Sequence, residues 1–190
     1  MAIISGIILG LAAKLVDVPE VTWKLPVLDD IGGRFGIWIF AATLLAVRSD
    51  TPAYAAVRAF GFFASMLLTY YLYTVLFLGF YPKSQMILWG AISLISPFCA
   101  FIIWFSNERN RAAAILGALP IAVIFAEWYV TGSENNLLFI AYLSMIICLL
   151  LFVPGTAKKR LSVLPYAAVM ALLLIKTGLM DFICREFLNI

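Results

Sequence analysis

Apolar residues dominate seven stretches of the chain, and charged or turn-forming residues separate these stretches. A helix needs about 20 mainly apolar residues to cross roughly 30 Å of hydrocarbon. The third stretch, bounded by Arg58 and Pro82, meets this need and carries a dense cluster of tyrosines in its second half. The pattern predicts an all-α, polytopic transmembrane helical bundle with seven spans at residues 2 to 16, 33 to 47, 56 to 80, 86 to 106, 112 to 132, 137 to 154 and 163 to 183. The first two stretches are short at about 1.5 Å of rise per residue, so six spans is the alternative.

Composition supports the same class of fold. The 190 residues are 65% hydrophobic and only 12% charged, about half the usual charged content of a soluble domain. The length fits one transmembrane domain over residues 1–190. The chain has no histidine, and its three cysteines lie in or beside apolar stretches, so we predict no metal site, no cofactor and no catalytic residue.

Loop charges predict the orientation. Every second loop is basic: Arg48 and Arg58 flank one, Arg109 and Arg111 the next, and Lys158, Lys159 and Arg160 the last. Cytoplasmic loops carry an excess of Lys and Arg. With seven spans, we therefore expect a cytoplasmic amino terminus and an external carboxyl terminus. The net charge of +3 is scattered over these loops, which indicates orientation and not nucleic-acid binding.

The first external connection, residues 16 to 33, is the long one. It is expected either to cap the outer face of the bundle or to lie loosely at headgroup depth with Trp23. Asp29 and Asp30 near its end are expected to favour the start of the next helix, where acidic groups complement the helix dipole.

Small residues and prolines predict where helices pack closely and where they bend. Gly6 and Gly10 form a GxxxG pair, which lets two helix backbones approach closely, so the first helix is expected to pack tightly on a neighbour. Pro97 and Pro120 fall inside the fourth and fifth spans. They are expected either to kink these helices and open space in the bundle or to be tolerated without a role.

Four polar residues on different spans lie at a common depth. Tyr73, Glu127, Lys176 and Arg34 are each about 14 to 16 residues from the last cytoplasmic charge of their span, or roughly 21 to 24 Å along a helix. An ionised group near the bilayer centre costs at least about 2.5 kcal/mol. We therefore expect these side chains to face protein, and we expect Glu127 to pair with Lys176.

These residues predict a ligand pocket that opens to the outside. Its lining would be Glu127, Lys176, Arg34, Tyr70, Tyr73 and Thr74, with Trp89 and Trp128 as walls. The alternative is that the tyrosines and tryptophans form an interfacial belt or pack between helices. In that case Lys176 extends toward Asp181 and the headgroups.

A set of aromatic and small residues resembles a known family. The matching residues are Gly36-Ile37-Trp38-Ile39-Phe40, Thr43-Leu44, Thr69-Tyr70-Tyr71-Leu72-Tyr73-Thr74, Gly79-Phe80-Tyr81-Pro82, Trp89, Ser96-Pro97 and Trp104. They resemble a family of small multi-span bacterial membrane proteins catalogued as a domain of unknown function. The resemblance implies a bacterial cytoplasmic membrane and no known activity. The architecture is also similar, at the level of fold alone, to the substrate-binding membrane subunits of vitamin importers.

Three functions remain open at this point. The leading hypothesis is a multi-pass protein that binds or transports a small solute through the predicted pocket. The alternative is a non-transporting accessory protein of a larger complex, and the third is a membrane-embedded enzyme, for which the sequence offers no signature. The expected partners are the lipid bilayer, a small solute, and partner membrane subunits or a second copy of the chain, with no nucleic acid.

Overall fold

The structure is a computed structural model that describes residues 1–16, 32–79, 82–108, 110–132, 136–152 and 157–188. These residues form eight α-helices and one short 3-10 helix, without any strand. The expectations for the first connection, including those for Trp23, Asp29 and Asp30, lie outside the described residues. The elements are α1 (Ala2–Val16), α4 (Phe35–Val47), α5 (Pro52–Leu78), α6 (Lys83–Trp104), η1 (Phe105–Asn107), α7 (Arg111–Thr131), α8 (Asn136–Phe152), α9 (Ala157–Lys176) and α10 (Leu179–Leu188).

Three of these helices are long and apolar enough to cross a membrane. They are α5, α6 continued by η1, and α7, and α9 with α10 makes a fourth if the bent pair is counted as one span. Helices α1, α4 and α8 are apolar but shorter. The predicted all-α membrane fold is thus confirmed, whereas seven crossings and a cytoplasmic amino terminus stay predictions. The 13 residues of α4 reach only about 20 Å, so this helix is short for a complete crossing.

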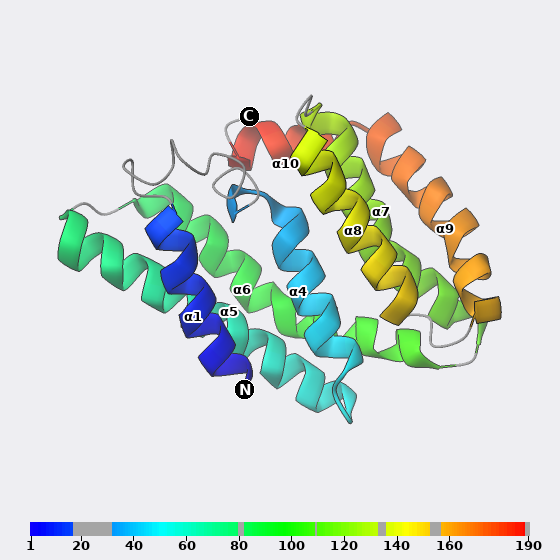
Figure 1. Ribbon diagram of the computed structural model, residues 1–190, viewed down its shortest axis with the longest axis horizontal. Helices are drawn as coiled ribbons and strands as arrows, with labels where there is room; N and C mark the ends of the chain where they lie inside the picture. Colours follow the sequence, from blue (N-terminus) through cyan, green and yellow to red (C-terminus); the bar gives the residue numbers. More distant parts are fainter. Residues whose placement is uncertain (17–31, 80–81, 109, 133–135, 153–156, 189–190) are drawn as a thin grey trace.

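The seventh predicted span, residues 163 to 183, is made of two helices with a break between them. Helix α9 ends at Lys176, and α10 leaves at an angle of 62°. Gly178 between them adopts a left-handed conformation with φ of 68°, which glycine tolerates and which commonly ends helices. Its N–H donates to the carbonyl of Ile175. The turn lays α10 against the end of α7 (Figure 1).

Helix α4 joins two groups of helices. One group contains α1, α5 and α6, and the other contains α7, α8 and α9 (Figure 1). Within each group the helices pack on each other, and α4 contacts α5, α6, α7 and α8. The chain from Phe35 to Val47 therefore lies at the centre of the described structure.

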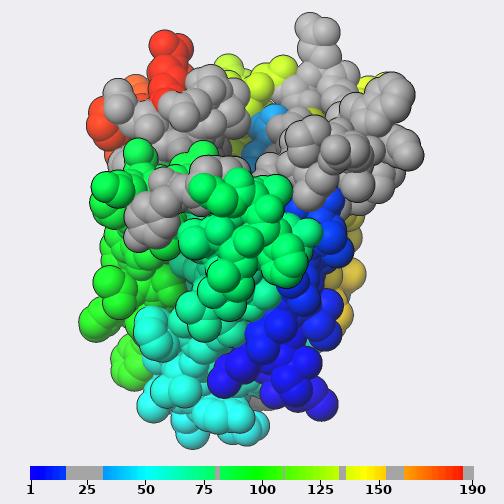
Figure 2. All heavy atoms as spheres, turned by 90° about the vertical axis from the view of Figure 1, so that its left-hand side faces the viewer, coloured from blue at the N-terminus to red at the C-terminus, as the bar shows by residue number. Residues whose placement is uncertain are grey.

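The GxxxG pair of α1 packs on α5, as the sequence predicts. A Cβ atom at Gly6 would collide with the carbonyl oxygen of Phe62 and the hydroxyl of Ser65, and one at Gly10 would lie 2.5 Å from the carbonyl oxygen of Met66. The Ser65 hydroxyl also lies 3.1 Å from the carbonyl oxygen of Ile3. Figure 2 shows α1 (blue) lying along this side of the molecule. The two backbones touch because neither glycine carries a side chain.

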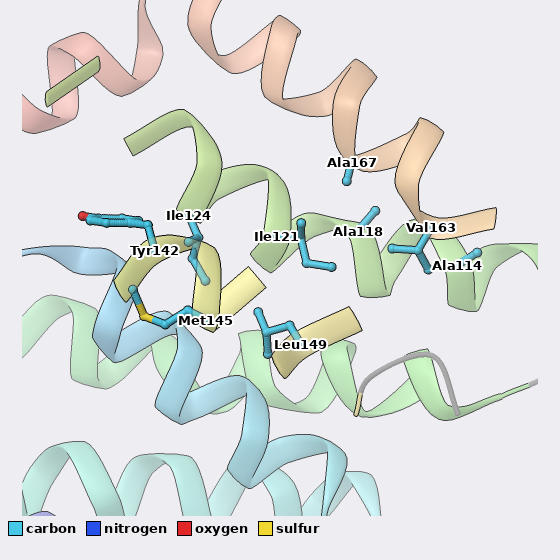
Figure 3. Packing of buried hydrophobic residues seen from close by; sticks show 9 residues of the cluster. All are labelled: Ala114, Ala118, Ile121, Ile124, Tyr142, Met145, Leu149, Val163 and Ala167. Atoms are coloured by element: carbon cyan, nitrogen blue, oxygen red, sulfur yellow. The ribbon is translucent and has the colours of Figure 1, made fainter. Parts of the chain in front are cut away.

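Small residues also bring α7 and α9 together. Ala114 and Ala118 of α7 face Val163 and Ala167 of α9, one turn apart on each helix (Figure 3). The cluster continues toward α8 and contains Ile121, Ile124, Tyr142, Met145 and Leu149. Helices α6 and α7 both continue through their internal prolines, Pro97 and Pro120. Pro120 is buried in its helix.

We predict that Gly10→Ala lowers the stability of the protein and that Gly90→Ala does not. The first substitution forces a Cβ atom against the backbone of Met66, whereas nothing lies within 4 Å of a Cβ at Gly90. Overpacking of this kind costs about 1 to 3 kcal/mol, and the helix propensity gained from alanine is shared by both variants. Apparent melting temperatures in detergent measure the difference. Equal melting temperatures would contradict the close contact of α1 with α5.

Candidate functional site

The first turn of α4 poses a chemical problem. The leading N–H groups of any helix lack partners within the helix, and here Arg34, the residue before Phe35, provides no side-chain cap. Phe35 and Gly36 are both buried, so water does not satisfy their N–H groups. A buried donor without an acceptor costs about 1 to 3 kcal/mol. The start of α4 therefore needs acceptors from elsewhere in the chain.

Glu127 of α7 supplies them. Its Oε1 accepts from the N–H of Phe35 at 2.7 Å, and its Oε2 accepts from the N–H of Gly36 at 2.6 Å. The hydroxyl of Tyr142 on α8 donates to the same Oε2 at 3.1 Å. The side chain of Glu127 is 0% exposed. One carboxylate thus links α4, α7 and α8 inside the protein.

Gly36 makes this approach possible. A Cβ atom at this position would lie 2.6 Å from Oε2 of Glu127 and 3.1 Å from the Cε1 atom of Tyr142. The first contact is shorter than real Cβ atoms show. Because glycine leaves the space open, the carboxylate reaches the backbone directly.

Two positive influences act on the buried carboxylate. The N-terminus of a helix carries a partial positive charge, and the buried guanidinium of Arg34, 5% exposed, acts electrostatically on Glu127 and interacts with the Tyr142 hydroxyl. Hydrogen bonds to a charged group contribute about 1.5 to 3 kcal/mol each. These contacts offset part of the cost of holding a carboxylate in an apolar environment. We call Glu127, Arg34, Tyr142 and the N–H groups of Phe35 and Gly36 the Glu127 cluster.

The other end of α4 is held by polar groups as well. The indole N–H of Trp104 donates to the carbonyl of Ser49 at 2.7 Å, and the side-chain amide of Asn107 donates to the carbonyl of Val47 at 2.8 Å. Arg58 reaches the carbonyl of Arg48 at 3.3 Å. These donors satisfy carbonyl groups that a helix end leaves free. Side chains from other helices therefore fix both ends of α4.

The structure brings together only some of the predicted site residues. The charge of Arg34 acts on Glu127, and the ring of Trp89 lies beside Phe35 with centroids 5.4 Å apart. Lys176, by contrast, is exposed. Glu127 and Lys176 form no pair among the described residues, because the helix N-terminus, Tyr142 and Arg34 surround the carboxylate instead. The expected pairing was wrong in its partner, and the cation of the cluster comes from the second span, not the seventh.

The predicted tyrosine lining lies elsewhere, on α5. The hydroxyl of Tyr70 lies 3.5 Å from Nζ of Lys14, which also sits 4.6 Å above the ring centroid of Tyr70. Thr74 is fully buried and donates to the carbonyl of Tyr70. Tyr73 stacks on Phe77. These contacts form a second polar region, between α1 and α5.

Trp128 also takes a position different from the expected wall. Its ring packs on Phe125 and Phe139, with centroid distances of 5.6 and 5.4 Å. It belongs to the apolar packing between α7 and α8. That any of these residues binds a ligand stays a prediction.

Sequence reasoning missed Tyr142 and Lys14. Tyr142 lies about as far inside its span as Glu127 does, so the same depth count could have found it. Lys14 is 3% exposed, although it is a lysine near a helix end, where exposure is usual. The backbone donors of Phe35 and Gly36 carry no sequence signal, because every residue except proline has an N–H group.

An all-helical fold with several membrane-spanning helices, and a carboxylate buried among them, defines the class: this chain is a membrane protein. Comparison with protein-family models, with curated proteins and with solved structures gives no match for it.

We predict that Glu127→Ala lowers the free energy of unfolding by about 3 to 5 kcal/mol, the usual cost of removing one partner from a buried charged pair. Glu127→Gln should lose less, about 1 to 3 kcal/mol, because one oxygen still accepts while the amide N–H₂ group faces donors. The matched control is Glu108→Gln at an exposed position, with a change within about 0.5 kcal/mol. Denaturant titration in mixed micelles measures all three. An alanine variant as stable as the control would show that Glu127 does not cap α4.

Gly36→Ala should disturb the contact between the Glu127 carboxylate and α4 by a change in α4 itself. The added methyl group meets Oε2 of Glu127 and the ring of Tyr142, whereas nothing lies within 4 Å of a Cβ at Gly33. We expect Gly36→Ala to cost about 1 to 3 kcal/mol and Gly33→Ala to have little effect. The same titration compares the two variants, and equal stability would contradict the approach of the carboxylate to α4.

Proposed function

We propose that this chain is a multi-pass protein of a bacterial cytoplasmic membrane that binds or transports a small solute, and that the Glu127 cluster is the ionisable element of its solute pathway. The observation that carries the proposal is the fully buried carboxylate of Glu127, bound to the start of a helix within the transmembrane bundle. Ionisable residues inside membrane bundles usually mark substrate or ion pathways. The bacterial setting rests on the family resemblance of the aromatic segments.

Capping the N-terminus of α4 does not require a charged side chain. A neutral side chain such as Asn or Ser accepts hydrogen bonds from the first N–H groups of a helix without bringing an ionised group into apolar surroundings. The chain instead uses a glutamate, an arginine and a tyrosine, all buried. The cost of three such groups supports a role that depends on charge.

The mechanism that fits this geometry is release of α4. The cluster as described is closed, with the carboxylate sealed from solvent. Displacement of Glu127 frees the N–H groups of Phe35 and Gly36, and protonation leaves only one oxygen that accepts well. Free N–H groups at a helix N-terminus form an anion-binding position. Because α4 contacts helices of both groups, its release at this end loosens the joint between them. Such a movement of two packed bodies is a usual basis of alternating exposure.

A second candidate function is the non-transporting accessory protein. The burial of the Glu127 carboxylate also favours this function, because both of its oxygens accept hydrogen bonds from groups of the chain itself. In this case the cluster only holds α4 in place, and the protein serves other membrane subunits or a second copy of itself.

Thermal unfolding with a panel of small solutes separates the two functions. We expect at least one solute to raise the melting temperature of the protein in lipid nanodiscs, because a ligand at 100 times its Kd stabilises by about 2.7 kcal/mol. The effect should disappear in Glu127→Gln and persist in Glu108→Gln. A panel without any effect favours the accessory protein. A solute whose effect survives Glu127→Gln would remove the cluster from the pathway.

A further inference from the structure

A cavity of about 240 Å³ lies where α10 crosses the end of α7. The residues that line it are Val130, Thr131, Asp181, Cys184 and Arg185. It is separate from the pocket that the sequence predicts, and only Thr131 and Val130 belong to the helix that carries Glu127. Its lining combines both signs of charge with a hydroxyl, a thiol and an aliphatic side chain.

The turn at Gly178 creates this cavity. It bends the chain so that Met180 and Cys184 of α10 are buried against Ala126 of α7. Asp181 and Arg185 stand one turn apart on the same helix and remain partly exposed, with side-chain exposures of 46% and 72%. The apolar contacts fix α10, while the charged side chains stay available at the cavity.

The two charged groups have unused bonding capacity. Nε of Arg185 donates to Oδ1 of Asp181 at 3.0 Å, which uses one of the five N–H donors of the guanidinium. Among the described residues, neither the Nη groups of Arg185 nor the Oδ2 atom of Asp181 forms a further hydrogen bond or ion pair. A bound carboxylate can accept from the Nη groups in a bidentate arrangement, and an ammonium can donate to Oδ2.

We propose that this cavity binds a small zwitterion, a solute with a carboxylate and an ammonium a few bonds apart, such as a small amino acid. The inference rests on the proposed solute-binding function and names its solute class. The volume equals that of about eight water molecules at roughly 30 Å³ each, which limits the ligand to a similar number of heavy atoms. A simple anion meets the repulsion of Asp181 and a simple cation that of Arg185, whereas a zwitterion matches both.

The cavity is next to the Glu127 cluster. Cys184 lines the cavity, and the charges of Glu127, Arg34 and Asp181 all act on its buried thiol. The hydroxyl of Thr131, also at the cavity, donates to the carbonyl of Glu127 at 2.8 Å. The cavity and the Glu127 cluster therefore share α7 and act on the same thiol, and in this proposal the solute pathway includes both.

Calorimetric titration in nanodiscs of phosphatidylglycerol tests the proposal. We expect glycine, β-alanine or 4-aminobutyrate to bind, and acetate and methylammonium to bind at least about tenfold more weakly, since each offers half of the contacts. Arg185→Gln and Asp181→Asn should each weaken zwitterion binding about tenfold or more, the loss expected for one charge-assisted contact. Arg111→Gln, which removes an exposed arginine at the start of α7, is the matched control. Unchanged melting temperatures verify that the variants fold.

Besides a panel without any binding, three results would overturn the proposal. The first is equal affinity for acetate or methylammonium, and the second is zwitterion binding that neither Asp181→Asn nor Arg185→Gln changes. Neither result contradicts the proposed solute-binding function if a solute still raises the melting temperature in a manner that depends on Glu127. If no solute of the panel binds, both the zwitterion site and the solute-binding function are contradicted. The third is binding abolished by phosphatidylethanolamine in the nanodiscs, which would identify a lipid headgroup, and not a free solute, as the occupant.

Discussion

The structure depends on the contact between the carboxylate of Glu127 and the first two N–H groups of α4. Helix α4 is central, since it contacts both groups of helices, and it is too short to place both ends in the headgroup regions. In hydrocarbon no water satisfies exposed backbone groups, so a helix end at depth must find partners in the protein. Glu127, itself bound by the Tyr142 hydroxyl, supplies the acceptors at one end of α4. Trp104, Asn107 and Arg58 supply the donors at the other end. Without these side chains, the joint between the two groups would carry unsatisfied donors and acceptors.

Apolar packing and polar capping stabilise different features of this bundle. Close contacts of small residues bring helices together. Gly6 and Gly10 of α1 pack against α5, and Ala114 and Ala118 of α7 pack against α9. In a membrane such packing, and not a hydrophobic driving force, holds helices to each other. It leaves the position of a short helix along its axis weakly determined, because apolar surfaces can slide by one turn. Two N–H groups bound to two oxygens of one carboxylate allow a single position, so the Glu127 cluster determines where α4 begins.

Much of the fold could be predicted from the sequence because span length and apolarity are local properties. Each of the seven predicted segments contains a helix, and the depth count correctly grouped Arg34 with Glu127. The break at Gly178 was missed because an apolar run does not reveal which glycine adopts a left-handed conformation. Lys176 was a reasonable partner for Glu127 by depth alone, but rotation about the helix axis decides which side chains face each other. The donors of Phe35 and Gly36 could not be predicted at all, since a backbone amide becomes a binding group only where a helix begins.

The Glu127 cluster and the neighbouring cavity of α10 give the functional proposals a common physical basis, a buried charge whose release would free a central helix. The most direct test of this account is amide hydrogen exchange of Phe35 and Gly36 in the nanodisc-embedded protein. First-turn amides usually lack acceptors and exchange readily. The account predicts that these two are protected as strongly as amides in the middle of α5, and that Glu127→Ala abolishes the protection. Rapid exchange of both amides in the unaltered protein would contradict it.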